Sequence, residues 1–264
     1  MVSSPGCHAL EGTDCHEQSN GRSEGSKQVS VAATDEQTTP TLDVVQELAC
    51  GDLATLLAPG RTTDQLSVNE RLQIVDYARI AALRLYLDGK IGASGTFPVD
   101  AYAAIEKLGI EVQQADIPHD TAVNPPRALA GLIYKDQGER DPHILVQKGL
   151  NPQHQVFTAC HELGHYLFWR AVTPSETHVD AAWGDVRPDH DEERFNDKGD
   201  DNEDMSPSEY AANTFAHMLL MPDAAVVALL QEGRNVAEMA DFFGVTEKSA
   251  RRRLSYFDVG SQTY

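Results

Sequence analysis

The feature that most constrains this chain is the segment His161-Glu162-Leu163-Gly164-His165, in which two histidines are four residues apart. Four residues of an α-helix turn by about 400° and advance by about 6 Å, so both imidazoles face the same way and can meet one metal ion. Glu162 lies about 100° round the helix, where it can take a proton from a metal-bound water but is badly placed to be a ligand. The segment predicts a metal-dependent hydrolase with Glu162 as general base, against the alternative of a helix that carries two unrelated histidines.

The residues around this segment predict a helix that follows a β-hairpin. Asn151-Pro152 is a helix start signal, and apolar residues recur at helical spacing from Val156 to Phe168. Upstream, the polar turn Lys135 to Asp141 separates two runs rich in Leu, Ile and Val, which are Ala128 to Tyr134 and His143 to Val146. The edge of this hairpin is expected to be exposed, so that it could receive a peptide as an added strand.

A catalytic zinc ion usually has three protein ligands and one position for water, so the chain has to supply a third ligand. The metzincin pattern is excluded, because Phe168 and Ala171 stand where its glycine and third histidine would be. The better candidate is Glu209, in the first turn of a helix predicted from Ser206 to Pro222. On the residues alone, the commoner explanation of Glu209 is an acid that stabilises the helix N-terminus.

Caps and an apolar stripe define this second helix. Ser206 or Ser208 can cap it, and Pro207 suits its first turn. The stripe that is expected to be buried consists of Ala212, Phe215, Ala216 and Leu219.

The segment between the two predicted helices, residues 176–205, is long and very acidic. Arg187, Arg194 and Lys198 are far outnumbered by Asp180, Asp185, Asp189, Asp191, Glu192, Glu193, Asp197, Asp200, Asp201 and Glu203. Such a run is typical of a solvated loop, and the alternative is a loop beside the active site that selects basic peptides. His178, Asp180 and His190 are weaker candidates for the third metal ligand, because a mobile loop is a poor place for a rigid site.

The composition predicts a soluble globular protein. The chain has 264 residues, 41% hydrophobic content and a formal net charge of −20. The start of the chain shows no basic region followed by an apolar stretch, which is the pattern of a signal peptide, and no run approaches about 18 apolar residues. A cytoplasmic location without a membrane partner is therefore expected. Four scattered cysteines favour reduced thiols.

The first 94 residues predict a tail followed by helices. Residues 1–40 have almost no large apolar side chains and are expected to be disordered, so a second metal clip at Cys7-His8 and Cys15-His16 is disfavoured. Ser67 and Glu70 form a capping box that opens a helix to about Leu87, after an earlier short helix from Thr41 to Leu57. Gly89 to Gly95 has the composition of a linker.

Residues 235–257 have the pattern of two helices joined by a turn, which is typical of a helix-turn-helix unit. Gly244 makes the turn and Thr246 caps the second helix, while the first helix presents the stripe Val236, Met239, Ala240 and Phe243. Arg251, Arg252 and Arg253 fall on or near the exposed side of the second helix and could meet DNA phosphates. A structural or protein-docking role is favoured, because the patch is small and the chain is strongly acidic.

These stretches together resemble the ImmA/IrrE-type zinc metallopeptidases, over roughly residues 95 to 255. The matching stretches are Pro98 to Val112, the two hairpin strands, Phe157 to Phe168, and Glu209 to Ala216 with its continuation to Pro222. The resemblance implies that Glu209 is the third zinc ligand and that Asn213 is the family's asparagine, which could orient a ligand. It also implies that such a chain cleaves a partner transcriptional repressor.

The predicted fold is α+β, with a zincin-like mini-domain in which a small antiparallel sheet packs on the histidine helix and on the second ligand helix. The expected organisation is a disordered tail (1–40), a helical extension (41–94), a zinc metallopeptidase domain (95–225, with the acidic loop 176–205) and a helix-turn-helix-like region (226–264).

The predicted function is that of a zinc-dependent endopeptidase. Zn²⁺ on His161, His165 and Glu209 would lower the pKa of a bound water and polarise the scissile carbonyl, while Glu162 moves the water's proton to the leaving amine. Candidates for the oxyanion-stabilising residue are Tyr210, His217 and His178. The alternative is a non-hydrolytic transcription regulator that binds through its zinc fold and contacts DNA with its C-terminal helices. Glu162 favours catalysis, since a binding protein needs no general base.

Overall fold

The computed structural model describes residues 53–87, 96–118, 128–134, 142–172, 183–187 and 205–261. Within these ranges the protein is α+β, as the sequence predicts. The predicted tail, the linker at Gly89 to Gly95, the hairpin turn and most of the acidic loop lie outside the described residues.

The described strands form one small mixed sheet. They are β1 (Glu111–Ala115), β2 (Ala128–Tyr134), β3 (His143–Gln147) and β4 (Trp183–Arg187), in the spatial order β1-β3-β2-β4. The predicted hairpin is confirmed, because β2 and β3 pair antiparallel. The prediction of an antiparallel sheet is right for the pairings of β2 and wrong for β1, because the hairpin returns the chain in the direction of β1 and β3 therefore pairs parallel with it.

Strand β4 lies inside the acidic segment, where the sequence predicts a solvated loop. It pairs antiparallel with β2, on the edge that β3 leaves open. The hairpin edge that is expected to be exposed is therefore occupied by another part of the chain. Gly184 and Asp185 are poor strand formers, so this strand depends on its pairing with β2 more than on its local sequence.

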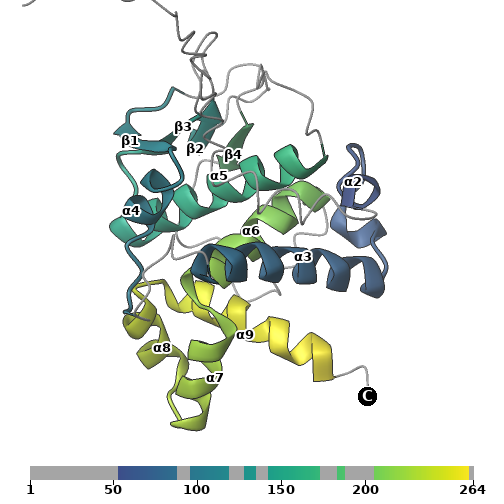
Figure 1. The fold of residues 1–264 in the computed structure, drawn as a ribbon, viewed down its shortest axis with the longest axis vertical. Helices are drawn as coiled ribbons and strands as arrows, with labels where there is room; N and C mark the ends of the chain where they lie inside the picture. The colour runs from purple at the N-terminus through teal and green to yellow at the C-terminus, as the bar shows by residue number, and fades with distance from the viewer. Residues whose placement is uncertain are drawn as a thin grey trace, which may run out of the picture. The chain divides into compact units, whose positions relative to one another are not determined.

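Helices α5 (Pro152–Val172) and α6 (Pro207–Leu220) begin where the sequence predicts. The Asn151 side chain accepts from the His154 N–H at 2.9 Å, and the Ser206 hydroxyl accepts from the Glu209 N–H at 3.2 Å. Figure 1 shows α5 between the sheet and α6, and it contacts both. This layering places one face of α5 against β2 and another against α6.

Helix α3 (Val68–Leu87) packs on α6 and joins the same hydrophobic core. Its predicted capping box is confirmed, since the Ser67 N–H donates to Glu70 Oε2 at 2.8 Å and the Glu70 N–H donates to Ser67 Oγ at 3.2 Å. The Tyr86 hydroxyl donates to the Leu219 carbonyl of α6. The short α2 (Leu53–Leu56) lies within the predicted helix from Thr41 to Leu57 and is followed by a 3-10 turn, η1 (Thr63–Gln65).

Helix α4 (Ala101–Glu106) precedes β1, in the order that the family resemblance implies. The Asp100 side chain caps it by accepting from the Ala103 N–H at 3.1 Å. Ile105 and the strand residues Ile144 and Val146 are fully buried against α5. The core therefore sits between the sheet and α5 and continues past α6 to α3.

Three helices follow α6: α7 (Asp223–Gln231), α8 (Val236–Phe243) and α9 (Glu247–Ser261). Asn235 and Glu238 form a capping box at the start of α8, and Gly244 ends it at a φ of 66°. The Thr246 hydroxyl accepts from the Ser249 N–H at 3.1 Å and caps α9. The two helices and the turn between them thus lie where the sequence predicts.

The three consecutive arginines of α9 do not share an exposed face. Arg251 is exposed, Arg252 is half-buried and Arg253 is 1% exposed. Arg253 Nε donates to the Met221 carbonyl at 2.8 Å, and its NH2 group forms an ion pair with Asp223. The prediction of a three-arginine phosphate patch is therefore wrong for Arg253, because neighbouring helical residues lie about 100° apart and the third one faces the core.

No single helix among the described residues is long and apolar enough to cross a membrane. Helices α6 and α7 meet that condition only together, and they are bent by 58° where they join. Most of α6 is buried inside the protein.

Candidate metal centre

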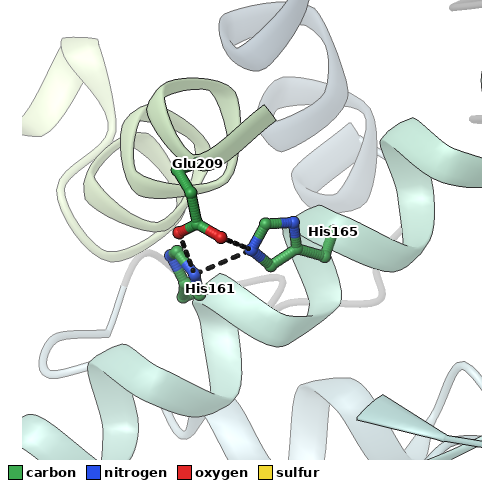
Figure 2. A group of neighbouring side chains, drawn as sticks. All are labelled: His161, His165 and Glu209. Atoms are coloured by element: carbon green, nitrogen blue, oxygen red, sulfur yellow. Dashed lines mark hydrogen bonds and ion pairs between the residues drawn. The ribbon is translucent and has the colours of Figure 1, made fainter. Parts of the chain in front are cut away.

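The structure brings His161, His165 and Glu209 to one point, as Figure 2 shows. The histidines lie one turn apart on α5, and Glu209 lies in the first turn of α6. The two histidine Nε2 atoms are 2.9 Å apart. Glu209 Oε2 is 3.3 Å from His161 Nε2, and Oε1 is 3.2 Å from His165 Nε2.

These distances fit a small divalent cation. Zinc binds histidine nitrogen and carboxylate oxygen at about 2.0–2.1 Å, so two donors of a tetrahedral site are about 3.3 Å apart. All three observed separations lie within about 0.4 Å of that value. Two imidazoles and one carboxylate are also a donor set found in catalytic zinc sites. The three residues could therefore hold a metal ion.

Burial and charge are consistent with a bound cation. His161 is fully buried and His165 nearly so, whereas the Glu209 side chain is 32% exposed. Burial alone would raise the pKa of the Glu209 carboxyl, but hydrogen bonds with His161 and His165 outweigh burial and hold this pKa below its usual range. Glu209 is therefore a carboxylate that faces two imidazoles and is partly open to solvent.

Glu162 is fully buried beneath the sheet, next to His161 on α5. Gly131 of β2 lies close to it, since an added Cβ there would lie 3.1 Å from Glu162 Oε1 and 2.5 Å from Thr158 Cγ2. A glycine is needed at this position because the strand backbone comes so close to the helix. The carboxylate that the sequence predicts as the base is thus packed under β2, beside the three donors.

Gly164 permits the close crossing of α5 and α6. An added Cβ at this residue would lie 3.0 Å from Phe215 Cδ1, 3.1 Å from Ala212 Cα and 3.3 Å from the Ala212 carbonyl oxygen. Two of these three atoms belong to the backbone of α6 and cannot rotate away. Because Glu209 stands one turn before Ala212, this crossing sets how far its carboxylate lies from the histidines.

Aromatic rings pack against His161. Phe157 stacks on His161 with ring centroids 6.4 Å apart and meets His217 of α6 at 4.9 Å. The His217 Nδ1–H donates to the Asn213 carbonyl at 2.7 Å. Burial chiefly lowers the pKa of His217 to about 3, so the imidazole is neutral and carries its one proton on Nδ1. In this geometry the Nδ1 proton of His217 is directed at the Asn213 carbonyl.

The other predicted site residues are placed as follows. Tyr210 is half-buried on α6, next to Glu209. The Asn213 side chain donates to the Met205 sulfur at 3.5 Å, not to one of the three donors. His178, Asp180 and His190 lie outside the described residues.

Comparison with known protein families identifies the family of the chain. The Peptidase_M78 model, described as the IrrE N-terminal-like domain, matches residues 105–255, which is more than half of the chain. The chain belongs to the Peptidase_M78 family. The match confirms the predicted resemblance and includes β1, both helices of the metal centre and most of α9. None of the curated proteins compared with the chain matches it.

Membership of Peptidase_M78 points to peptidase activity, and the donor group on α5 and α6 is consistent with a metal-dependent peptidase.

No role is predicted from the sequence for two residues that shape this site, namely Gly131 and Gly164. A glycine inside a strand or helix pattern often marks a close approach of two backbones, and that signal is present at both positions.

Proposed function

We propose that this Peptidase_M78 chain is a zinc-dependent endopeptidase that cleaves a partner transcriptional repressor. The observation that carries the proposal is the convergence of His161, His165 and Glu209 within hydrogen-bonding distance of one another, with Glu162 beside them on the same helix. The zincin-like arrangement of the sheet and the two helices is part of the same proposal.

His161, His165 and Glu209 would hold the ion. Two imidazole nitrogens favour zinc over magnesium or calcium, which prefer oxygen donors, and the single carboxylate completes three protein ligands. When bound, zinc lowers the pKa of a water molecule and polarises the carbonyl of the scissile bond. The partly exposed side chain of Glu209 leaves the site accessible to solvent and to a peptide.

Glu162 is the proposed general base. Its carboxylate removes a proton from the attacking water and delivers that proton to the amine that leaves. Burial beneath β2 fixes its position and keeps bulk water from competing for it. Phe157 packs beside His161 and restricts the orientation of its ring, and the neutral His217 packs on the Phe157 ring.

The repressor is proposed from the resemblance to ImmA/IrrE-type peptidases, and a cytoplasmic location is proposed with it. We further propose that α8 and α9 form a helix-turn-helix-like unit whose role is structural or is to dock a protein. In support, Arg253 is hydrogen-bonded to the Met221 carbonyl inside the protein, and Arg251 forms an ion pair with Glu247 at 2.9 Å. Two of the three arginines therefore already have partners within the chain, which weakens the case for phosphate binding. The acidic chain is also expected to repel DNA.

The proposal can be tested with a repressor encoded next to the gene of this chain. The purified repressor is incubated with the zinc-loaded wild type, with a zinc-loaded Glu162→Gln variant and with wild type plus a chelator. Mass spectrometry of the products should find an internal cut with the wild type alone. Zinc content is measured in each sample, because Glu162→Gln should keep the metal. An intact repressor in the presence of zinc-loaded wild type would contradict the proposal for that partner, and equal cutting by Glu162→Gln would contradict the role of the base.

A further inference from the structure

Strand β2 packs over the proposed base through Gly131, and both of its edges are paired. One edge pairs with β3 and the other with β4, both antiparallel. Peptidases that bind an extended peptide commonly add it as a strand to an open sheet edge. At β2 that edge is filled by a strand from the chain's own acidic segment.

The position of β4 along β2 coincides with the site. Leu132 pairs with Gly184 and Leu129 with Val186, and the register shifts between these pairs. Gly131, which lies over Glu162 and Thr158, falls within that shift. The backbone of β4 therefore runs past the stretch of β2 that covers the base.

We propose that β4 is an internal inhibitor, which occupies the strand position of the substrate and has to leave β2 before an extended peptide can bind there. The inference rests on the proposed peptidase function and concerns its regulation. The ligand that displaces β4 is an extended polypeptide strand, and the carboxylates flanking β4 in the sequence favour one that carries basic residues.

The sequence and pairing of β4 make it a replaceable strand. It has five residues, two of which, Gly184 and Asp185, disfavour strands. The register shift interrupts its ladder with β2, which weakens the pairing further. Long connections join it to the rest of the chain, since α5 ends at Val172 and α6 begins at Pro207. Connections of this length allow β4 to leave without moving the helices that carry the three donors.

Tethering makes β4 an effective competitor in spite of this weak pairing. A strand held near its site by the chain on both sides of it has an effective concentration on the order of millimolar. A peptide that is free in solution therefore binds β2 only at a higher concentration than it would need if β4 were absent. A partner that docks elsewhere on the protein gains the same advantage of tethering and can replace β4.

The first test locks β4 in place. In the Leu132→Cys/Gly184→Cys variant, the two cysteines face each other in register, within the distance that a disulfide spans. The probe is a fluorescein-labelled peptide with the sequence of residues 181–189, and binding is followed by fluorescence anisotropy. We expect the oxidised variant to bind at least ten-fold more weakly than the same protein after reduction. Leu132→Cys alone, treated identically, controls for oxidation of the native cysteines.

The second test weakens β4. In Gly184→Pro/Val186→Pro, proline removes two strand N–H groups, and Asn196→Pro in the same segment but outside β4 is the control. We expect at least ten-fold tighter peptide binding than in the wild type, and faster hydrogen exchange at the amides of Leu129 to Ile133. Equal binding by the locked, wild-type and proline proteins would overturn the proposal and make β4 a permanent fourth strand. Because neither readout needs turnover, a lack of repressor cleavage would count against the proposed function and would leave this result standing.

Discussion

Replacing Gly164 by alanine should damage the metal centre through the crossing of α5 and α6. The added Cβ would lie 3.0 Å from Phe215 Cδ1 and 3.1 Å from Ala212 Cα. Carbon atoms in contact are normally about 3.5–4.0 Å apart, so α6 has to retreat by about 0.5 Å. Glu209 stands one turn from Ala212 and moves with the helix, whereas zinc ligands must be placed to within about 0.2 Å.

Two opposing contributions set the change in stability of the metal-free protein. Overpacking costs about 1–3 kcal/mol, and the higher helix propensity of alanine returns about 1 kcal/mol. The free energy of unfolding should therefore fall only modestly. Zinc affinity should fall by about 10–100-fold, as it does when residues that support metal ligands are changed.

A competition titration of zinc against a chromophoric chelator measures this affinity in folded protein. Gly149→Ala is the matched control, because an added Cβ there meets nothing within 4 Å. Gly149→Ala should bind zinc as the wild type does. If Gly164→Ala also bound zinc as tightly as the wild type, the geometric argument about the helix crossing would be wrong.

Three further substitutions test other contacts. Gly131→Ala should lower the free energy of unfolding by about 1–3 kcal/mol. Adding Thr158→Ser should restore part of this loss, because it removes the Cγ2 atom that lies 2.5 Å from the new Cβ, and additive losses of the two substitutions in urea unfolding would contradict this. Arg253→Met should cost about 1–3 kcal/mol, because the Met221 carbonyl and Asp223 lose a buried partner, whereas Arg251→Met at an exposed ion pair should cost less than about 0.5 kcal/mol. Burial lowers the pKa of His217 in the folded state to about 3, whereas its ordinary value is 6.5. Between these pH values the unfolded state binds more protons, so the free energy of unfolding falls as the pH decreases. Metal-free wild type should lose up to about 1.4 kcal/mol per pH unit relative to His217→Gln, and parallel pH profiles of the two proteins would refute this.

Local signals in the sequence were sufficient for the starts of four helices. Ser67, Asn151, Ser206 and Asn235 each cap a helix within three residues of themselves, so the starts of α3, α5, α6 and α8 could be predicted without knowledge of the fold. The hairpin of β2 and β3 was predictable for a similar reason, because both strands lie close together in the sequence.

Features that depend on distant contacts could not be predicted in this way. Strand β4 contains residues that disfavour strands, and only its pairing with β2 makes it one. The burial of Arg253 depends on how α9 packs against the junction of α6 and α7. Both features arise from tertiary structure that overrides the local pattern.

The metal centre lies between these two cases. The spacing of His161 and His165 predicts a shared face from helix geometry alone. Glu209 is 44 residues further along the chain than His165, and on local grounds an acid at a helix N-terminus is the commoner explanation of it. In the structure it occupies that first turn and also faces both histidines, so the two interpretations are compatible.

The zinc content of purified variants tests the central claim most directly. The wild type and Glu162→Gln should each retain about one zinc per chain after dialysis, because we propose Glu162 as the base and not as a ligand. Glu209→Ala should lose the stoichiometric metal, whereas His190→Ala in the acidic segment should keep it. Full zinc in Glu209→Ala together with loss of zinc in His190→Ala would contradict the account and would move the third ligand into the acidic segment.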